Sequence, residues 1–154
     1  MHGKTGALVA AAVILLSGCG DGREKSDMLS PEEMARRKAI PIEPQPILYP
    51  DIEKHKLFGP NCAFAADGHG IAAVVLAMRE DGYMKLREKM VRFAADSGSR
   101  TLPMDARSRY SGKEYAFEIT LEGEGVNGGK GHLRVTDAHN IVVYEAPGTI
   151  QCNG

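Results

Sequence analysis

The chain has 154 residues, with 19 Lys and Arg against 20 Asp and Glu, and its formal net charge at pH 7 is −1. Binding to a phosphate backbone needs a strongly basic surface, whereas the basic residues here are interleaved with acidic ones. This balance argues against a nucleic-acid partner and predicts solvated faces of mixed charge.

The N-terminal residues have the pattern of an export signal. A positively charged start ending at Lys4 leads into an apolar run from Ala7 to Leu16, which is too short to span a bilayer. The run ends in Leu16-Ser17-Gly18-Cys19, which resembles the lipobox of bacterial lipoproteins. That resemblance implies a signal peptide of residues 1–18 and lipidation of Cys19, with palmitate among the attached chains. The alternatives are a secretory peptide with an incidental cysteine and a retained anchor helix.

Lipidation would tether the mature protein to a membrane without spanning it, because several acyl chains anchor far more firmly than one. Gly20 is not the aspartate that, in lipoprotein families, resembles an inner-membrane retention signal. The resemblance therefore implies a lipid-anchored protein of the cell envelope, on the outer membrane and facing the periplasm in a cell that has two membranes.

If Cys19 is acylated, Cys62 and Cys152 remain as an internal pair. Exported thiols meet an oxidising compartment, so the sequence predicts a disulfide between them. It would close a loop holding most of the folded domain, for which chain entropy gives about 4 to 5 kcal/mol and measurements more often about 2 to 4 kcal/mol. Two buried or metal-binding thiols are the alternative, although zinc sites usually present closely spaced cysteine pairs.

Residues 19–50 have the composition of a tether. Ser30-Pro31 followed by Glu33 is typical of a capped helix start and predicts a short helix through about Lys38. Four prolines between Ile40 and Pro50 then favour an extended, semi-rigid spacer. Its apolar residues offer a second interpretation, in which this segment lies across the domain or across a partner.

The domain proper is expected over residues 51–154, and its first half has strand and turn signals. A strand is expected at 62–65, a turn at 67–70, an apolar run at 71–78 and a hairpin turn at Asp81-Gly82. The segment from Tyr83 to Asp96 fits either one helix or two short strands around residues 87–89. The neighbouring turn and β-rich flanks favour the strands.

The second half shows clearer strand patterns. Apolar and polar residues alternate from Lys113 to Glu122, which is the period of a half-buried strand. Residues 132–136 and 141–145 flank a turn and predict a hairpin, and Pro147-Gly148 is expected to turn the chain once more. The fold class is therefore mainly β, a small antiparallel barrel or sandwich with a short helix, closed by the disulfide.

Few residues have a pattern typical of catalysis or of cofactor binding. The glycine-rich stretch 123–131 departs from the phosphate-loop pattern, because Glu124 replaces the first glycine and Gly131 the hydroxyl residue that follows Lys130. It predicts a mobile hairpin loop and no nucleotide. The histidines lack the paired spacing of metal ligands, and no nucleophile motif is present. We therefore expect a protein that is not an enzyme and has neither cofactor nor metal.

One motif suggests a partner. Ser111-Gly112-Lys113-Glu114-Tyr115 has the SGxxY form of membrane-bound lysozyme inhibitors of the MliC type, and Lys130-Gly131 is similar to their later KG pair. The resemblance implies a periplasmic lipoprotein with a β-barrel in which Ser111 and Lys130 contact the carboxylates of a lysozyme cleft. The other interpretation is a turn that enters a strand, with Tyr115 in the core.

Two functions are consistent with these patterns. The favoured one is a non-catalytic envelope lipoprotein, a binding or structural module that contacts another envelope protein through a sheet face, the proline-rich spacer or the 123–131 loop. The alternative is a lysozyme inhibitor of the MliC type.

Overall fold

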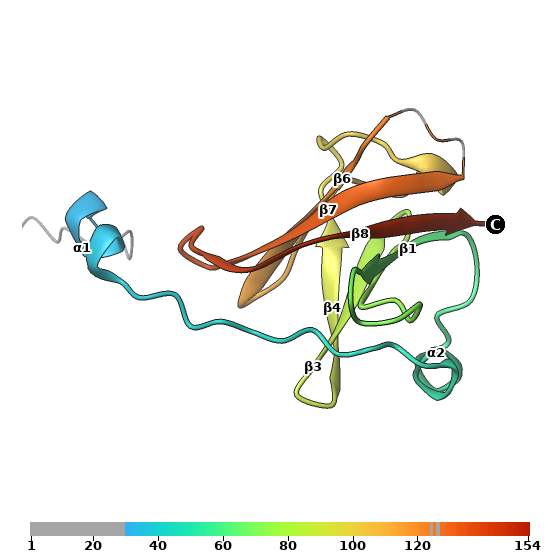
Figure 1. Cartoon of the computed structure of the whole chain (residues 1–154), viewed down its shortest axis with the longest axis horizontal. Helices are drawn as coiled ribbons and strands as arrows, with labels where there is room; N and C mark the ends of the chain where they lie inside the picture. The colour runs from blue at the N-terminus through green and yellow to red at the C-terminus, as the bar shows by residue number, and fades with distance from the viewer. Residues whose placement is uncertain (1–29, 124, 126) are drawn as a thin grey trace, which may run out of the picture.

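The computed structural model describes residues 30–123, 125 and 127–154. In that part of the chain eight antiparallel strands form a closed barrel in which each strand pairs with the next and the last pairs with the first (Figure 1). The strands are β1 (Asn61–Ala66), β2 (Val75–Ala77), β3 (Asp81–Leu86), β4 (Lys89–Ala95), β5 (Arg109–Ser111), β6 (Tyr115–Leu121), β7 (Gly128–Asp137) and β8 (Val142–Asn153). The mainly-β prediction is confirmed, and the fold is a barrel. The expected signal peptide of residues 1–18 and the expected lipidation of Cys19 fall outside the described residues.

The barrel interior is filled by side chains, as the narrow bore of an eight-stranded barrel requires. Along β6, Phe117, Ile119 and Leu121 are buried while Thr120 is exposed, so the predicted alternation is confirmed. The largest fully buried side chains come from all eight strands and include Phe64, Val75, Met84, Phe93, Tyr110, Phe117, Ile119, Leu133, Val135 and Ile150.

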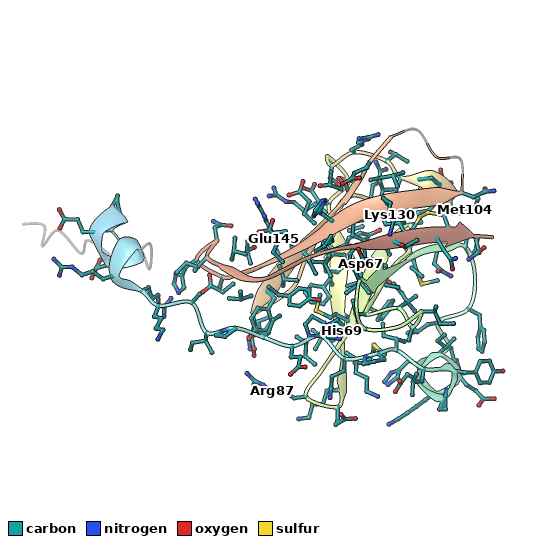
Figure 2. The ribbon with its side chains drawn as sticks, in the orientation of Figure 1. Asp67, His69, Arg87, Met104, Lys130 and Glu145 are labelled. Carbon is teal, nitrogen blue, oxygen red and sulfur yellow. A yellow bond between two sulfur atoms is a disulfide. The ribbon has the colours of Figure 1, made fainter. Side chains whose placement is uncertain are left out.

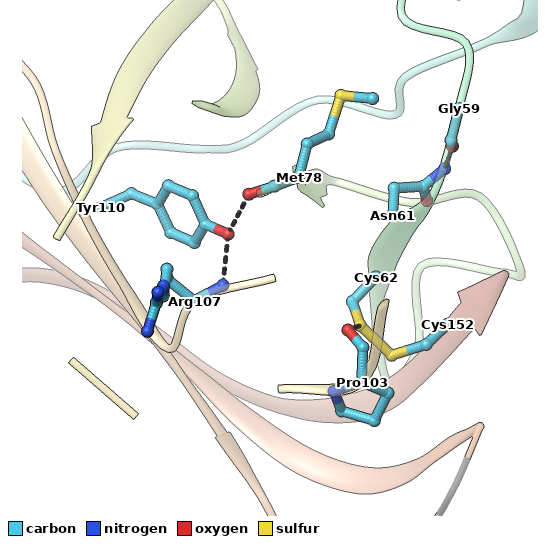
Figure 3. Close-up of a disulfide and its surroundings, with 8 residues drawn as sticks. All are labelled: Gly59, Asn61, Cys62, Met78, Pro103, Arg107, Tyr110 and Cys152. Atoms are coloured by element: carbon cyan, nitrogen blue, oxygen red, sulfur yellow. Dashed lines mark hydrogen bonds between the residues drawn. A yellow bond between two sulfur atoms is a disulfide. The ribbon is translucent and has the colours of Figure 1, made fainter. Parts of the chain in front are cut away.

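The predicted disulfide is present and joins the first strand to the last (Figure 3). Cys62 on β1 lies directly opposite Cys152 on β8 in the strand register, and their Cα atoms are 4.0 Å apart. Both residues are buried. The bond therefore fastens the two strands whose pairing closes the barrel.

Tyr83 to Asp96 contains two strands, as the flanking pattern favoured. β3 and β4 pair along six residues and are joined by the two-residue turn Arg87-Glu88. Both turn residues have positive φ, 48° and 61°, a conformation that asparagine and glycine adopt more readily. The sequence signal for this hairpin was therefore weak at its turn.

Two expected turns are wrong, because each dipeptide lies within a strand. Gly82 belongs to β3, and a Cβ atom there would lie 2.5 Å from Phe117 Cζ and 2.8 Å from Tyr110 Cδ1. Glycine is needed at position 82 because two aromatic rings pack closely against its backbone. Only residues 75–77 of the expected apolar run 71–78 form a strand, and the bend that follows lies at residues 79–80.

The second wrong turn is Pro147-Gly148, which lies in the middle of β8. The carbonyl of Pro147 accepts a hydrogen bond from the Asp67 N–H, just beyond the end of β1. The N–H and C=O of one residue point to the same side of a strand, so an N–H at position 147 would also point toward β1. Because β1 has already ended at this level, the proline leaves no strand-to-strand hydrogen bond unmade. Gly148 is needed because a Cβ atom would lie 2.5 Å from the Phe64 ring.

The glycine-rich stretch is only partly a loop. Residues 128–131 belong to β7 and pair with β8, so the expected hairpin loop over 123–131 is too long. A Cβ atom on Gly128 would lie 2.1 Å from the carbonyl oxygen of Ile150. Glycine at this position therefore permits a close contact between two strand backbones.

The end of the barrel near the disulfide is covered by the loop between β4 and β5. This loop contains a short 3-10 helix (Pro103–Asp105) and buries Leu102 and Ala106 in the core. The Tyr110 hydroxyl accepts a hydrogen bond from the Arg107 N–H at 2.7 Å and donates one to the Met78 carbonyl at 2.6 Å (Figure 3). Tyr110 thus fastens the covering loop to the connection between β2 and β3.

The segment before the barrel begins with α1 (Pro31–Arg36). The Ser30 hydroxyl accepts a hydrogen bond from the Glu33 N–H at 3.2 Å, and the Glu33 carboxylate accepts one from the Ser30 N–H at 2.9 Å. The predicted capping box is therefore confirmed. The pKa of Glu33 is lowered because its carboxylate accepts hydrogen bonds from the Ser30 N–H and, at 2.8 Å, from the Ser30 hydroxyl.

The proline-rich segment lies across the barrel, which is the second of the two interpretations of its sequence (Figure 1). It leads into α2 (Tyr49–His55), a helix the sequence analysis missed, and the expected boundary at residues 50/51 falls inside this helix. Ile47, Ile52 and Leu57 pack on the outside of β1–β3 against residues that include Ala63, Leu76 and Tyr83. This second apolar cluster buries both faces of the sheet at that side.

Candidate functional site

The turns of four hairpins lie together at one end of the barrel, because consecutive strands alternate in direction. These turns connect β1 to β2, β3 to β4, β5 to β6 and β7 to β8, and we call this end the mouth. The segment 41–47, which we call the strap, crosses the mouth as an extended chain (Figure 1). The strap and the turns together form the candidate site.

Three backbone hydrogen bonds hold the strap in place. The N–H groups of Ile42, Gln45 and Ile47 donate to the carbonyls of Val143 at 3.1 Å, Lys85 at 2.8 Å and Ala73 at 2.7 Å. Prolines stand at three of the other strap positions and have no N–H to satisfy. The proline-rich sequence therefore suits an extended segment that touches the barrel at a few points.

The strap also grips the tip of the β3–β4 hairpin. The Glu88 N–H donates to Gln45 Oε1 at 2.6 Å, and Gln45 Nε2 donates to the Glu88 carboxylate. One glutamine side chain therefore binds both the backbone and the side chain of a residue with positive φ. This contact offsets part of the cost of the glycine-free turn.

An ion pair fixes the start of α2 against the same hairpin. Lys85 Nζ lies 3.1 Å from Asp51 Oδ2, and both side chains are largely buried. Asp51 also accepts the Leu48 N–H at 3.0 Å, and this backbone hydrogen bond is the main cause that lowers the pKa of Asp51. The hydrogen bond to Asp51 raises the pKa of Lys85.

Between the strap and the β4 side of the mouth runs a groove of about 800 Å³. Its apolar lining comes from strap, strand and turn residues, namely Ile42, Leu86, Val91, Phe93 and Tyr115. Its cationic lining consists of Arg87, Lys89, Arg92 and Lys113, while Glu43 and Glu114 are its carboxylates. His69, in the turn after β1, also lines the groove. Figure 2 labels His69 and labels Arg87 at the tip of the β3–β4 hairpin. Mouths of small barrels are common binding sites, and this one has an apolar floor and a basic rim.

Three of the four cations form no ion pair in the described part of the chain. Arg92 Nη2 lies 2.7 Å from Asp81 Oδ1. Among residues 30–123 and 127–154, no carboxylate lies within ion-pair distance of Arg87, Lys89 or Lys113. The rim therefore favours an anionic ligand.

The two residues of the inhibitor resemblance lie far apart. Ser111 is exposed at the end of β5 and pairs with Ala116, whereas Lys130 is exposed on β7, where its carbonyl accepts the Glu122 N–H. Positions 116 and 122 are separated by the length of β6, about 20 Å at 3.3 Å per residue. The structure does not bring Ser111 and Lys130 into one site.

Each of these residues has a different setting. Lys130 Nζ lies 3.6 Å from Asp67 Oδ1 and 3.5 Å from Thr149 Oγ1 on the barrel exterior (Figure 2). Ser111 begins the β5–β6 turn, in which the Gly112 N–H donates to the Tyr115 carbonyl at 2.8 Å. The SGKEY motif is thus a turn that enters a strand, and its last three residues line the groove.

Sequence reasoning missed the groove as a site. A usable signal was the run of basic residues around the β3–β4 turn together with apolar residues in the proline-rich segment. Within the described residues, no group of three or more His, Cys, Asp or Glu could hold a metal ion. Among the described helices, none combines the length and the apolar character needed to cross a bilayer.

The arrangement offers recognition by shape, apolar contact and positive charge. Among the residues that line the groove, no nucleophile lies within hydrogen-bond distance of a base. Comparison of the chain with known protein families, with curated proteins and with solved structures finds no match.

Proposed function

We propose that this protein is a non-catalytic, lipid-anchored module of the bacterial cell envelope that binds another envelope protein through the groove at the barrel mouth. The observation that carries the proposal is the basic rim above an apolar floor, in a groove whose wall is a docked proline-rich strap. A barrel with a side-chain-filled interior leaves its mouth as the concave surface for a ligand.

The envelope location rests on the lipobox and is supported by the disulfide. A bond between Cys62 and Cys152 is expected in an oxidising compartment, outside the cytosol. Metabolic labelling with a palmitate analogue tests the anchor directly: the label should appear on the wild-type protein and disappear in Cys19→Ser. Mature protein that retains Met1 would contradict the anchor.

Site-specific photocrosslinking in intact cells tests the binding role. A photoreactive residue replaces Lys113 in the groove, or Lys54 on the exposed face of α2 as the matched control position. A specific protein adduct should form from position 113 and be absent from position 54. Identical adducts from both positions, or none from position 113, would remove the proposed binding role.

The lysozyme-inhibitor alternative requires Ser111 and Lys130 to act together, and their separation counts against it. Its test is the lysis of bacterial cell walls by c-type lysozyme in the presence of the purified protein. Undiminished lysis removes the alternative. Inhibition that Ser111→Ala and Lys130→Ala both relieve would support it.

A further inference from the structure

One strand beside the groove has an unpaired edge. β4 pairs with β3 along six residues, but it pairs with β5 only at Ala94 and Ala95. Residues 89–92, which we call the β4 edge, therefore have no strand partner on the β5 side. Lys89, Val91 and Arg92 of this edge line the groove.

The backbone direction shows which groups face the open side. The Ala95 N–H donates to the Glu80 carbonyl on the β3 side, whereas the Asp96 N–H donates to the Arg109 carbonyl on the β5 side. The backbone N–H and C=O groups of successive residues point to opposite edges of a strand, so even-numbered residues of β4 share the direction of Asp96. The N–H and C=O groups of Met90 and Arg92 therefore point to the open side. In the described part of the chain, no turn or loop carbonyl accepts a hydrogen bond from either N–H.

The opposite edge of the same hairpin is already covered. The strap residue Gln45 forms a β-bridge with Lys85, and its N–H donates to the Lys85 carbonyl. An uncovered edge is unusual, because proteins generally protect strand edges from pairing with other chains. The contrast within one hairpin singles out the β4 edge.

We propose that the β4 edge binds an extended segment of the partner protein, which adds to the sheet as a strand and carries alternating acidic and apolar side chains. This inference rests on the proposed function and specifies the form of the ligand. An added strand would hydrogen bond to the Met90 and Arg92 backbone. Its apolar side chains would lie beside Val91 and Phe93, on the face toward the barrel interior, and its acidic ones beside Arg92 on the other face. Lys89 shares the face of Val91 but is exposed at the end of the strand, where its charge would attract an acidic residue.

Charge selects this occupant over a second copy of the chain. A second copy paired through its own β4 edge would bring its Arg87, Lys89, Arg92 and Lys113 to the same seam, and like charges brought together across an interface are unfavourable. Acidic residues in a partner would instead meet Arg87, Lys89 and Lys113, which form no ion pair with any described carboxylate.

Amide hydrogen exchange on the full chain, purified in detergent, tests the strand addition. The probe is a synthetic peptide that alternates glutamate and valine. At saturation the exchange of the Met90 and Arg92 amides should slow by at least on the order of tenfold. The Val91 and Phe93 amides, which already point toward β3, are the internal controls and should change much less. A peptide that binds and leaves the Met90 and Arg92 amides unchanged would overturn the strand addition.

Charge reversal tests the acidic character of the ligand. Lys89→Glu combined with Lys113→Glu should weaken the glutamate–valine peptide by on the order of tenfold or more, whereas Lys54→Glu on α2 should leave its affinity unchanged. Equal binding of a lysine–valine peptide would refute the charge selection. If neither peptide binds while the crosslink from position 113 persists in cells, this inference fails and the proposed function stands; if the crosslink is absent too, both fail.

Discussion

The disulfide offers the sharpest test of how this fold is stabilised. Replacing Cys62 and Cys152 together by alanine removes a crosslink between residues 90 positions apart in the chain. A loop of that size lowers the entropy of the unfolded chain by an amount worth about 4 to 5 kcal/mol, and measured losses more often reach about 2 to 4 kcal/mol. The native strands keep six register pairs between β1 and β8 without the bond.

We expect the double variant to fold and to lose about 3 kcal/mol of its free energy of unfolding. For a domain of this size, that loss corresponds to a fall in melting temperature of about 10 to 20 °C. Urea unfolding followed by circular dichroism measures it, and the slope of the free energy against urea should rise because the uncrosslinked unfolded chain exposes more surface.

A reductant provides the control for this experiment. It should lower the stability of the wild-type protein to that of the double variant and leave the variant itself unchanged. A loss below about 1 kcal/mol would refute the argument that the long loop carries the stabilisation.

Three further predictions concern single residues. Tyr110→Phe should cost about 1 to 3 kcal/mol in urea unfolding, because the Arg107 N–H and the Met78 carbonyl lose their partner; a change below about 0.5 kcal/mol would contradict that role. Burial raises the pKa of Tyr110 to about 12. The stabilisation that Tyr110 gives the folded protein should therefore be intact below about pH 10 and be lost as the pH rises toward 12. Tyr110→Phe should lack this loss of stability at high pH. Gly82→Ala should cost about 1 to 3 kcal/mol, since its Cβ would overlap the Phe117 ring, and unchanged thermal unfolding would show that the ring moves aside. The pKa of Asp51 is lowered in the folded protein, so the stabilisation that its carboxylate gives the fold should be lost as the pH falls below about 4. Asp51→Asn should reduce the loss of stability in acid. Identical curves of stability against pH for the wild-type protein and the variant would disprove the contribution of Asp51.

Local patterns in the sequence predicted most strands and the turns at residues 67–70 and 137–140, but they placed two other turns where the chain continues as strand. The alternation along residues 115–121 is a property of one strand, so it was sufficient to place β6 and its buried face. Gly82 and Pro147-Gly148 looked like turns because their residue types favour turns. Their actual roles depend on a ring from β6 and on where β1 ends, which involve contacts distant in sequence.

The candidate site was harder to predict, because it is assembled from separate turns. Arg87, Lys113 and Ile42 lie in three segments that meet only when the barrel closes and the strap docks. The sequence did show that the proline-rich segment had apolar side chains to bury. It could not show which of its backbone groups would find partners on β3 and β8.

The coverage of the β3–β4 hairpin sets a limit on self-association. An open-ended polymer needs two different complementary surfaces on each copy, whereas a contact between identical surfaces closes after two copies. The strap occupies one side of this hairpin through the bridge between Gln45 and Lys85, which leaves the β4 side for intermolecular pairing. One copy of this hairpin therefore has a single edge through which it can pair with another molecule, so pairing through it gives a complex of two molecules and not a fibre.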